Sequence, residues 1–189
     1  MIKVTQVRTA SQMRRFVQFP LVLYKNCPHY VPAIYADERN ILNPAKNPNL
    51  VDCEVRCYLA YKDGKVAGRI AAIEQKAYNA LSGRKCLRFS RFDCIDDREV
   101  AAALFAAVEA FGREKGLDTL HGPWGFDDMD REGMLTEGFD RRATYATNYN
   151  FEYYKNLVTS LGFQDESEWV EYEFDMPEEV DARIAHVAS

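Results

Sequence analysis

Hydrophobic and polar residues change their period several times along the chain, and each period predicts a type of element. Apolar residues alternate with polar ones from Ile2 to Val7, which predicts a short strand. A helical period follows and predicts a helix, which Ser11 is expected to cap and Pro20 to bend. The apolar positions of this helix are Met13, Phe16, Val17, Leu21 and Tyr24. Two prolines then make residues 26–32 irregular, and residues 36–42 have room only for a short helix.

Period-two alternation dominates the next part of the chain and predicts a hairpin from Glu54 to Glu74. Its first strand places four apolar residues on one face: Val55, Cys57, Leu59 and Tyr61. Asp63 and Gly64 between the two strands are typical of a tight two-residue turn. A further strand is expected from Cys86 to Cys94, so the centre of the chain predicts at least three strands of one sheet.

After residue 96, apolar residues again recur at helical spacing and predict a second long helix. The apolar residues of this helix are Ala101, Leu104, Phe105, Val108 and Phe111. Asp96 and Glu99 frame its start like a capping box, and Gly116 ends it. Asp118 to His121 then predicts another short strand. A strand, a helix and a strand in succession predict that the last two strands lie in the same sheet.

The remaining elements are separated by a long connection, residues 122–148, and connections of this length are usually functional or disordered. A helix is expected from about Phe151 to Leu161, ended by Gly162. Val170 to Met176 alternates apolar residues with acids, which predicts a strand with one solvated face. Another helix should start at Pro177.

Charge is distributed unevenly over the 189 residues. The net charge is −5, yet nine acids and no base lie between Asp165 and Ala182, and residues 1–164 carry 23 bases against 20 acids. This body tolerates an anionic ligand but is not basic enough to indicate nucleic acid. No run of about 20 apolar residues is present, so no membrane partner and a cytoplasmic location are expected.

Cysteine and histidine spacing argues against a metal site or a disulfide framework. The five cysteines form no CxxC pair, and the three histidines are far apart. Asp128, Asp130 and Glu132 imitate the opening of a calcium loop, but its twelfth position is Phe139, which cannot ligate. We therefore expect reduced thiols and no bound metal.

Several stretches together carry a resemblance to a known superfamily. They are Lys62 to Ile73, Leu120 to Phe126, Glu132 to Asp140, Asn148 to Asn150, Tyr153-Tyr154 and Leu161 to Phe163. With the element order, they resemble an uncharacterised, acyltransferase-like bacterial branch of the GCN5-related N-acetyltransferases (GNAT). The resemblance covers most of residues 1–176, which we expect to form one domain. Residues 177–189 would start a C-terminal helix, and the alternative that a longer chain continues it stays open.

The resemblance implies an α/β fold of the α+β kind, with a central, mainly antiparallel mixed sheet flanked by helices. It implies a splay, which forms the ligand cleft, between the strands that end near Cys94 and His121. It further implies acyl transfer from acetyl-CoA or another acyl-CoA to the amine of a small molecule. Asp93 would be the general base, while Tyr154 or Tyr149 would be the acid, because the family's usual tyrosine position is Val158 here.

One segment departs from the family pattern. The donor would lie against residues that the resemblance places at a glycine-rich pyrophosphate loop: Cys94, Ile95, Asp96, Asp97 and Arg98. This segment contains no glycine, and its two aspartates would repel a pyrophosphate at a helix N-terminus. The departure leaves an alternative open, in which a non-catalytic relative binds a small ligand or a partner segment.

The long connection contains more large apolar residues than a solvated loop needs. We expect it to fold over the cleft mouth, with Trp124 and Phe126 as walls. The polar and aromatic residues expected beside the substrate are Glu137, Asp140, Asn148 and Tyr153. The alternative is that its apolar residues only extend the core. The acceptor amine, the acyl group and the oligomeric state, including a homodimer, stay open.

Overall fold

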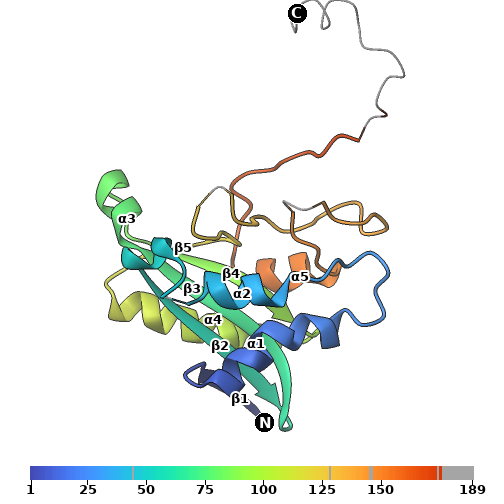
Figure 1. Ribbon diagram of the computed structural model, residues 1–189, viewed down its shortest axis with the longest axis horizontal. Coiled ribbons are helices and arrows are strands. Elements are labelled where there is room, and N and C mark those ends of the chain that lie inside the picture. The colour runs from blue at the N-terminus through green and yellow to red at the C-terminus, as the bar shows by residue number, and fades with distance from the viewer. Residues whose placement is uncertain (44, 128, 145–146, 174, 176–189) are drawn as a thin grey trace, which may run out of the picture.

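The computed structural model describes residues 1–43, 45–127, 129–144, 147–173 and 175, and it forms a sheet with helices on both faces (Figure 1). The elements are β1 (Ile2–Gln6), α1 (Ala10–Leu23), α2 (Tyr35–Ile41), η1 (Pro48–Val51), β2 (Cys53–Lys62), β3 (Lys65–Gln75), α3 (Lys76–Ser82), β4 (Cys86–Cys94), α4 (Arg98–Glu114), β5 (Thr119–His121) and α5 (Tyr153–Thr159). The predicted fold class is confirmed.

The five strands lie in sequence order, β1-β2-β3-β4-β5. All neighbours are antiparallel except β4 and β5, which are parallel. The predicted hairpin is present, and Asp63 and Gly64 make its turn with φ of 51° and 78°. A positive φ at both central residues matches the twist of the flanking strands, which explains why Asp-Gly occurs here.

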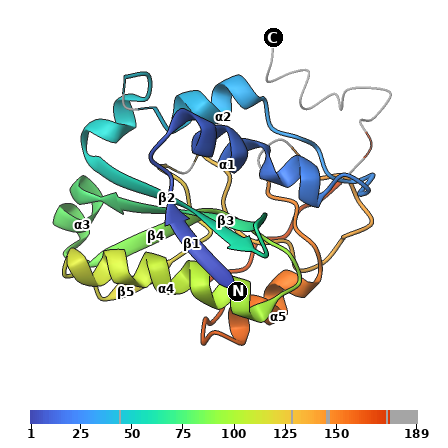
Figure 2. The same ribbon diagram turned by 90° about the horizontal axis from the view of Figure 1, so that it is seen from below.

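Two hydrophobic clusters fill the space between the sheet and its helices. Figure 2 shows α1 and α2 on one face of the sheet and α4 on the other. Alternation along β2 divides its residues between the two faces, so that Leu59 packs under α1 with Phe16, and Ala60 packs under α4 with Leu104. The sheet is therefore buried on both faces around β3 and β4.

Two sequence-based expectations about helix caps are wrong. The side chain of Thr9, not Ser11, caps α1, and it forms a capping box with Gln12. Asp97, not Asp96, caps α4, because its carboxylate accepts the amides of Glu99 and Val100. In both cases two neighbouring residues are chemically able to cap, and the backbone decides between them.

The end of the chain also differs from the expectation. Residues 170–173 and 175 are not in a strand, although their side chains alternate between apolar and acidic, because no neighbouring strand pairs with them. Residues 174 and 176, and the expected helix of residues 177–189, lie outside the described residues. Conversely, α3 and η1 form in segments where no element is expected.

Candidate active site

The candidate site begins where β5 leaves β4. Only three residue pairs join these strands, from Cys86–Thr119 to Arg88–His121. The next contact is a hydrogen bond of 2.8 Å from the Trp124 amide to the Phe89 carbonyl. Gly122 permits this close approach, because a Cβ at this position would lie 2.3 Å from that carbonyl oxygen. On the side of β5, therefore, no strand among the described residues pairs with the second half of β4, as the predicted splay requires.

A β-bulge in β4 lies directly before the site. Arg69 pairs with Asp93 and Ala71 pairs with Ser90, so β4 holds one residue more than β3 between these pairs. Arg91 takes up the extra residue with a φ of 50°, an uncommon conformation for a non-glycine residue. Bulges re-aim side chains and often lie beside active sites. This bulge places the carboxylate of Asp93 on the face that α1 covers, beside the guanidinium of Arg69.

Asp93 is the centre of a buried polar cluster. Its Oδ2 atom accepts a hydrogen bond of 2.7 Å from Nε of Arg69, whose Nη1 donates to the Phe16 carbonyl. Its Oδ1 atom lies 2.9 Å from the hydroxyl of Tyr24 and 3.3 Å from that of Tyr154. The two phenol oxygens are 2.8 Å apart. Two tyrosines and one arginine thus surround a single carboxylate.

Two neighbouring tyrosines of α5 occupy the edge of β4 that β5 leaves free. The hydroxyl of Tyr154 accepts a hydrogen bond of 3.1 Å from the Cys94 amide. The hydroxyl of Tyr153 donates one of 2.7 Å to the Cys94 carbonyl. Both backbone groups of Cys94 are therefore paired by side chains in the place where a neighbouring strand would pair them.

Burial dominates the electrostatics of this cluster. Burial raises the pKa of Asp93 above its ordinary value, although Arg69 and the hydrogen bonds from both tyrosines oppose the shift. Burial, reinforced by the negative charge of Asp93, raises the pKa values of Tyr24 and Tyr154 well above 10. Both phenols therefore stay protonated near neutral pH, and Asp93 accepts protons more readily than an exposed aspartate.

A second ionic cluster lies beside the first, on the same face of the sheet. The bulge residue Arg91 donates to Glu38 of α2 at 3.0 Å, and its Nη1 lies 3.5 Å from Asp130. Asp130 in turn accepts the Phe126 amide at 3.3 Å and packs so closely on Gly125 that a Cβ there would lie 2.0 Å from its carboxylate. This cluster joins α2, β4 and the long connection.

The segment expected to hold the donor is largely satisfied by the chain itself. The amides of Cys94, Ile95 and Asp97 donate to Tyr154, Ala67 and Ile95, respectively. The amides of Glu99 and Val100 in the first turn of α4 donate to the carboxylate of Asp97, which also pairs with Lys62. The side chain of Arg98 donates to Ser160, while Asp96 is exposed. The N-terminus of α4 therefore does not present a set of free amides to a pyrophosphate.

The long connection places its expected site residues in different surroundings. Phe126 is 2% exposed and packs in the cluster under α1, so packing alone accounts for it. Trp124 is half-buried, and the guanidinium of Arg88 lies 3.5 Å from the centre of its ring. The amide of Asn148 donates to the Gly133 carbonyl at 3.1 Å. Glu137 and Asp140 are exposed on the outer part of the connection.

Tyr149, the other expected acid, lies near the cluster without joining its hydrogen bonds. Its hydroxyl donates to the Phe139 carbonyl at 2.9 Å, and its ring meets that of Tyr24 edge-on with centroids 6.0 Å apart. Burial raises its pKa to about 12. Val158, at the family's usual tyrosine position, is buried in the core. Of the expected catalytic residues, the structure therefore brings Asp93 and Tyr154 together.

Two residues of the cluster were missed as site residues from the sequence. The helical pattern identifies Tyr24 only as an apolar position. In the structure Tyr24 is the residue at the end of α1, and its hydroxyl donates a hydrogen bond to Asp93. Arg69 lies between Gly68 and Ile70, within the part of β3 from Val66 to Ile73 that is otherwise apolar. A charged residue in a buried strand needs a buried partner, and this signal could have identified it.

Two features are absent from the described residues. No group of three or more His, Cys, Asp and Glu residues among them could hold a metal ion. No helix in the described part of the chain is both long enough and apolar enough to cross a membrane.

Comparison with solved structures defines the class of this fold. The structure is similar to an aminoglycoside acetyltransferase from an uncultured soil metagenomic sample, solved with sisomicin, at a TM-score of 0.53 and 11% identity over 93% of this chain and 97% of that one. It is also similar to a predicted acetyltransferase from Clostridium acetobutylicum, solved with acetyl-CoA, at a TM-score of 0.52 and 12% identity over 92% of this chain and 96% of that one. The chain has the fold of the GCN5-related N-acetyltransferases.

Two curated proteins are similar in sequence. Protein YghO of Escherichia coli K12 is 31% identical over 153 residues, which cover 81% of this chain and 39% of that protein. The bacterial ceramide synthase of Caulobacter vibrioides is 27% identical over 175 residues, which cover 92% of this chain and 46% of that protein. The chain thus spans less than half the length of either relative. No protein-family model matches the sequence.

Proposed function

We propose that this chain is an N-acyltransferase domain, which moves an acyl group from a thioester to an amine. The observation that carries the proposal is the buried carboxylate of Asp93, hydrogen-bonded to two phenols where β4 and β5 separate. The fold supports it, because the acetyltransferases above share that fold. The name of the Caulobacter relative also supports it, since a ceramide is a fatty amide of a long-chain amine.

The reaction needs a proton acceptor and a proton donor close together. The neutral amine attacks the thioester carbonyl, the C–N bond forms, the C–S bond breaks, and the nitrogen must lose one proton while the sulfur gains one. We assign the acceptor role to Asp93, and the hydroxyl of Tyr24, which lies 2.9 Å from its Oδ1 atom, would relay the proton to it. Tyr154 would protonate the sulfur and regain its proton from Asp93 at 3.3 Å.

The donor class that we propose is acyl-CoA, but the N-terminus of α4 does not fit its pyrophosphate. The amides there are used within the chain, and Asp96 and Asp97 add negative charge. Phosphates are favoured at helix N-termini because free amides and the helix dipole attract them. We therefore derive no step from a pyrophosphate bound at α4.

The test is a mass-spectrometric assay for amide product, with a short and a long acyl-CoA as donors and a long-chain amino alcohol and sisomicin as acceptors. Tyr154→Phe and Asp93→Asn should each lower kcat by about 100-fold or more, the usual contribution of general acid–base catalysis. In wild type, kcat/KM should fall as pH is lowered through the raised pKa of Asp93, because only the carboxylate accepts a proton.

Tyr58→Phe is the matched control, because Tyr58 is a buried tyrosine on the face of the sheet that α4 covers. It should leave kcat unchanged. Circular dichroism and melting curves check that each variant is folded. Wild-type rates in folded Tyr154→Phe and Asp93→Asn would overturn the assigned roles, and a loss in Tyr149→Phe alone would identify Tyr149 as the acid.

A second candidate function is supported by the satisfied amides of α4. A domain that keeps this fold without a phosphate grip can bind a small ligand or a partner segment without catalysis. Calorimetry with CoA and acetyl-CoA separates the two candidates. Binding together with turnover supports the enzyme, whereas the absence of heat, of a thermal shift and of any amide product favours the binding module.

A further inference from the structure

The first 36 residues carry an unusual charge balance for a chain of net charge −5. They contain no acid and five bases, which are Lys3, Arg8, Arg14, Arg15 and Lys25. All five are exposed, and none forms an ion pair with any carboxylate in the described part of the chain. By contrast, Arg113 and Arg141 on other parts of the surface each pair with a glutamate. Five exposed cations without an ion pair thus lie on β1, on α1 and next to the ends of α1.

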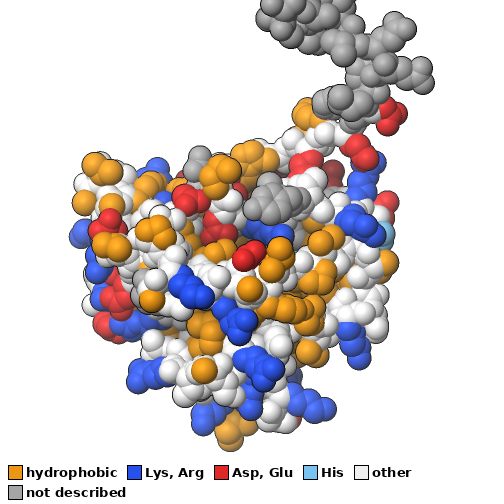
Figure 3. Space-filling view, in the orientation of Figure 1, with side chains coloured by type: hydrophobic (Ala, Val, Ile, Leu, Met, Phe, Trp, Pro, Cys, Tyr) orange, Lys and Arg blue, Asp and Glu red, His pale blue; other side chains and the backbone are white. Residues whose placement is uncertain are grey.

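Exposed aliphatic side chains lie on the same face. Along α1, Arg14, Gln18 and Val22 point outward from one stripe of the helix, because they are spaced four residues apart. Val22 is 67% exposed, and Ile34, which precedes α2, is 69% exposed. Figures 1 and 2 show α1 and α2 side by side over one face of the sheet. In Figure 3 the Lys and Arg side chains of this face are interspersed with hydrophobic ones.

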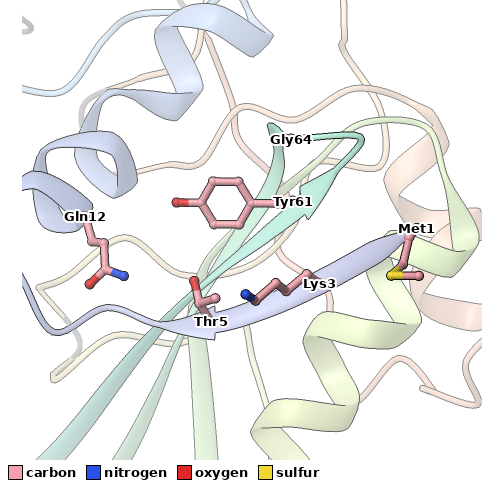
Figure 4. A pocket seen from close by; sticks show the side chains of 6 residues that line it. All are labelled: Met1, Lys3, Thr5, Gln12, Tyr61 and Gly64. Carbon is pink, nitrogen blue, oxygen red and sulfur yellow. The ribbon is translucent and has the colours of Figure 1, made fainter.

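A hollow of about 360 Å³ extends this face to the edge of the sheet (Figure 4). The side chains of Lys3 and Thr5 from β1, Gln12 from α1 and Tyr61 from β2 surround it. The Thr5 hydroxyl is buried and has no hydrogen-bond partner. The hollow therefore places Lys3, one of the five cations, beside several polar groups, in a recess large enough for a small anionic headgroup.

We propose that the face formed by β1, α1 and the segment before α2 binds the surface of an anionic phospholipid bilayer. The five cations would lie at the level of the phosphates, and Val22, Val31 and Ile34 would reach the boundary of the acyl chains. Aliphatic side chains among cations favour a lipid surface over nucleic acid, where aromatic side chains stack on bases. A protein that lies on a membrane needs no spanning helix, so this proposal revises the expectation of no membrane partner.

The position of this face relates it to the candidate site. Tyr24 follows the last residue of α1 and its hydroxyl contacts Asp93, while Lys25 is the next residue along the chain. The ring of Tyr30, which comes just before Val31, stacks on that of Tyr24 with centroids 4.3 Å apart. A long-chain amine held in the bilayer would thus meet the protein beside the Asp93 cluster. The binding of the face does not depend on catalysis.

The test is flotation of the full chain with vesicles of phosphatidylcholine alone and of phosphatidylcholine with phosphatidylglycerol, without any acyl donor. Wild type should bind the anionic vesicles, and more weakly at high salt. Each Lys or Arg near an anionic surface contributes about fivefold in affinity, so Arg14→Gln/Arg15→Gln should bind about 25-fold more weakly. Val22→Ser/Ile34→Ser should reduce the binding that remains at high salt.

The matched control is Arg113→Gln/Arg141→Gln, which removes the same charge from α4 and from the long connection and should bind as wild type. Equal loss in both double variants would overturn the proposal, because net charge alone would then explain binding. Equal binding to neutral vesicles would also overturn it. Retention by duplex DNA or self-association on gel filtration, without vesicle binding, would assign the face to those partners instead.

Discussion

At the scale of single residues, the structure gives opposite shifts to two carboxylates that lie close together. Burial raises the pKa of Asp93. Burial acts on Glu38 in the same direction, but the guanidiniums of Arg91 and Arg69, with the hydrogen bond from Arg91, together lower its pKa below 4.5. The difference follows from the number of cations that each carboxylate faces. Of these two carboxylates, it is therefore Glu38 that stabilises the fold in its ionised form.

Glu38→Gln should reveal this contribution through pH. Because the pKa of Glu38 is lower in the folded state, its stabilisation is present above pH 4.5 and is lost as pH falls through the folded value. Urea unfolding at pH 7 should show a loss of about 1–3 kcal/mol in the variant, and the gap to wild type should narrow at acid pH. Glu109→Gln, in an exposed pair within α4, should cost about 0.5 kcal/mol or less. A gap that stays constant at acid pH would contradict the argument.

At the scale of elements, the start of α4 combines a capping site with the place expected for a phosphate. The side chain of Asp97 accepts two amides of α4, at 3.0 and 3.3 Å. Asp97→Ala should lower the free energy of unfolding by about 1–2 kcal/mol, because the cap and the ion pair with Lys62 are both lost. Asp97→Ser should recover part of it, and Asp96→Ala should change it little, as thermal unfolding will show. An equal cost at both aspartates would contradict the capping role.

The sequence predicts most elements because their signals are local. The alternation in β2 and β3, the Asp-Gly turn and the spacing in α4 each lie within one segment, and these elements are where the patterns place them. The residues from 170 onward carry the same alternation, yet those that are described form no strand. A strand needs a partner, and no local pattern shows whether one is available. The observed capping residues differ from the predicted ones for a similar reason, since nearby side chains compete for the same amides.

At the scale of the whole molecule, the candidate site joins parts that are far apart in sequence. Tyr24 lies 69 residues from Asp93, and Tyr154 lies 61 residues beyond it. The sequence could suggest Asp93 and Tyr154 from a family resemblance. It could not indicate Tyr24, because the contact depends on where α1 ends above the sheet and on the bulge at Arg91. The basic face likewise becomes visible only when the described ion pairs are known.

The two tyrosines on the free edge of β4 also have a consequence for hydrogen exchange. An amide on an unpaired edge normally exchanges fast with solvent, but the Cys94 amide is bonded to the hydroxyl of Tyr154 and buried under α5. It should therefore exchange only when α5 opens away from the sheet. In Tyr154→Phe, exchange of this amide should accelerate about tenfold, since a bond of about 1.4 kcal/mol is lost. The Leu59 amide of β2, which is flanked by strands on both sides, should keep its rate, and deuterium uptake followed by NMR measures both.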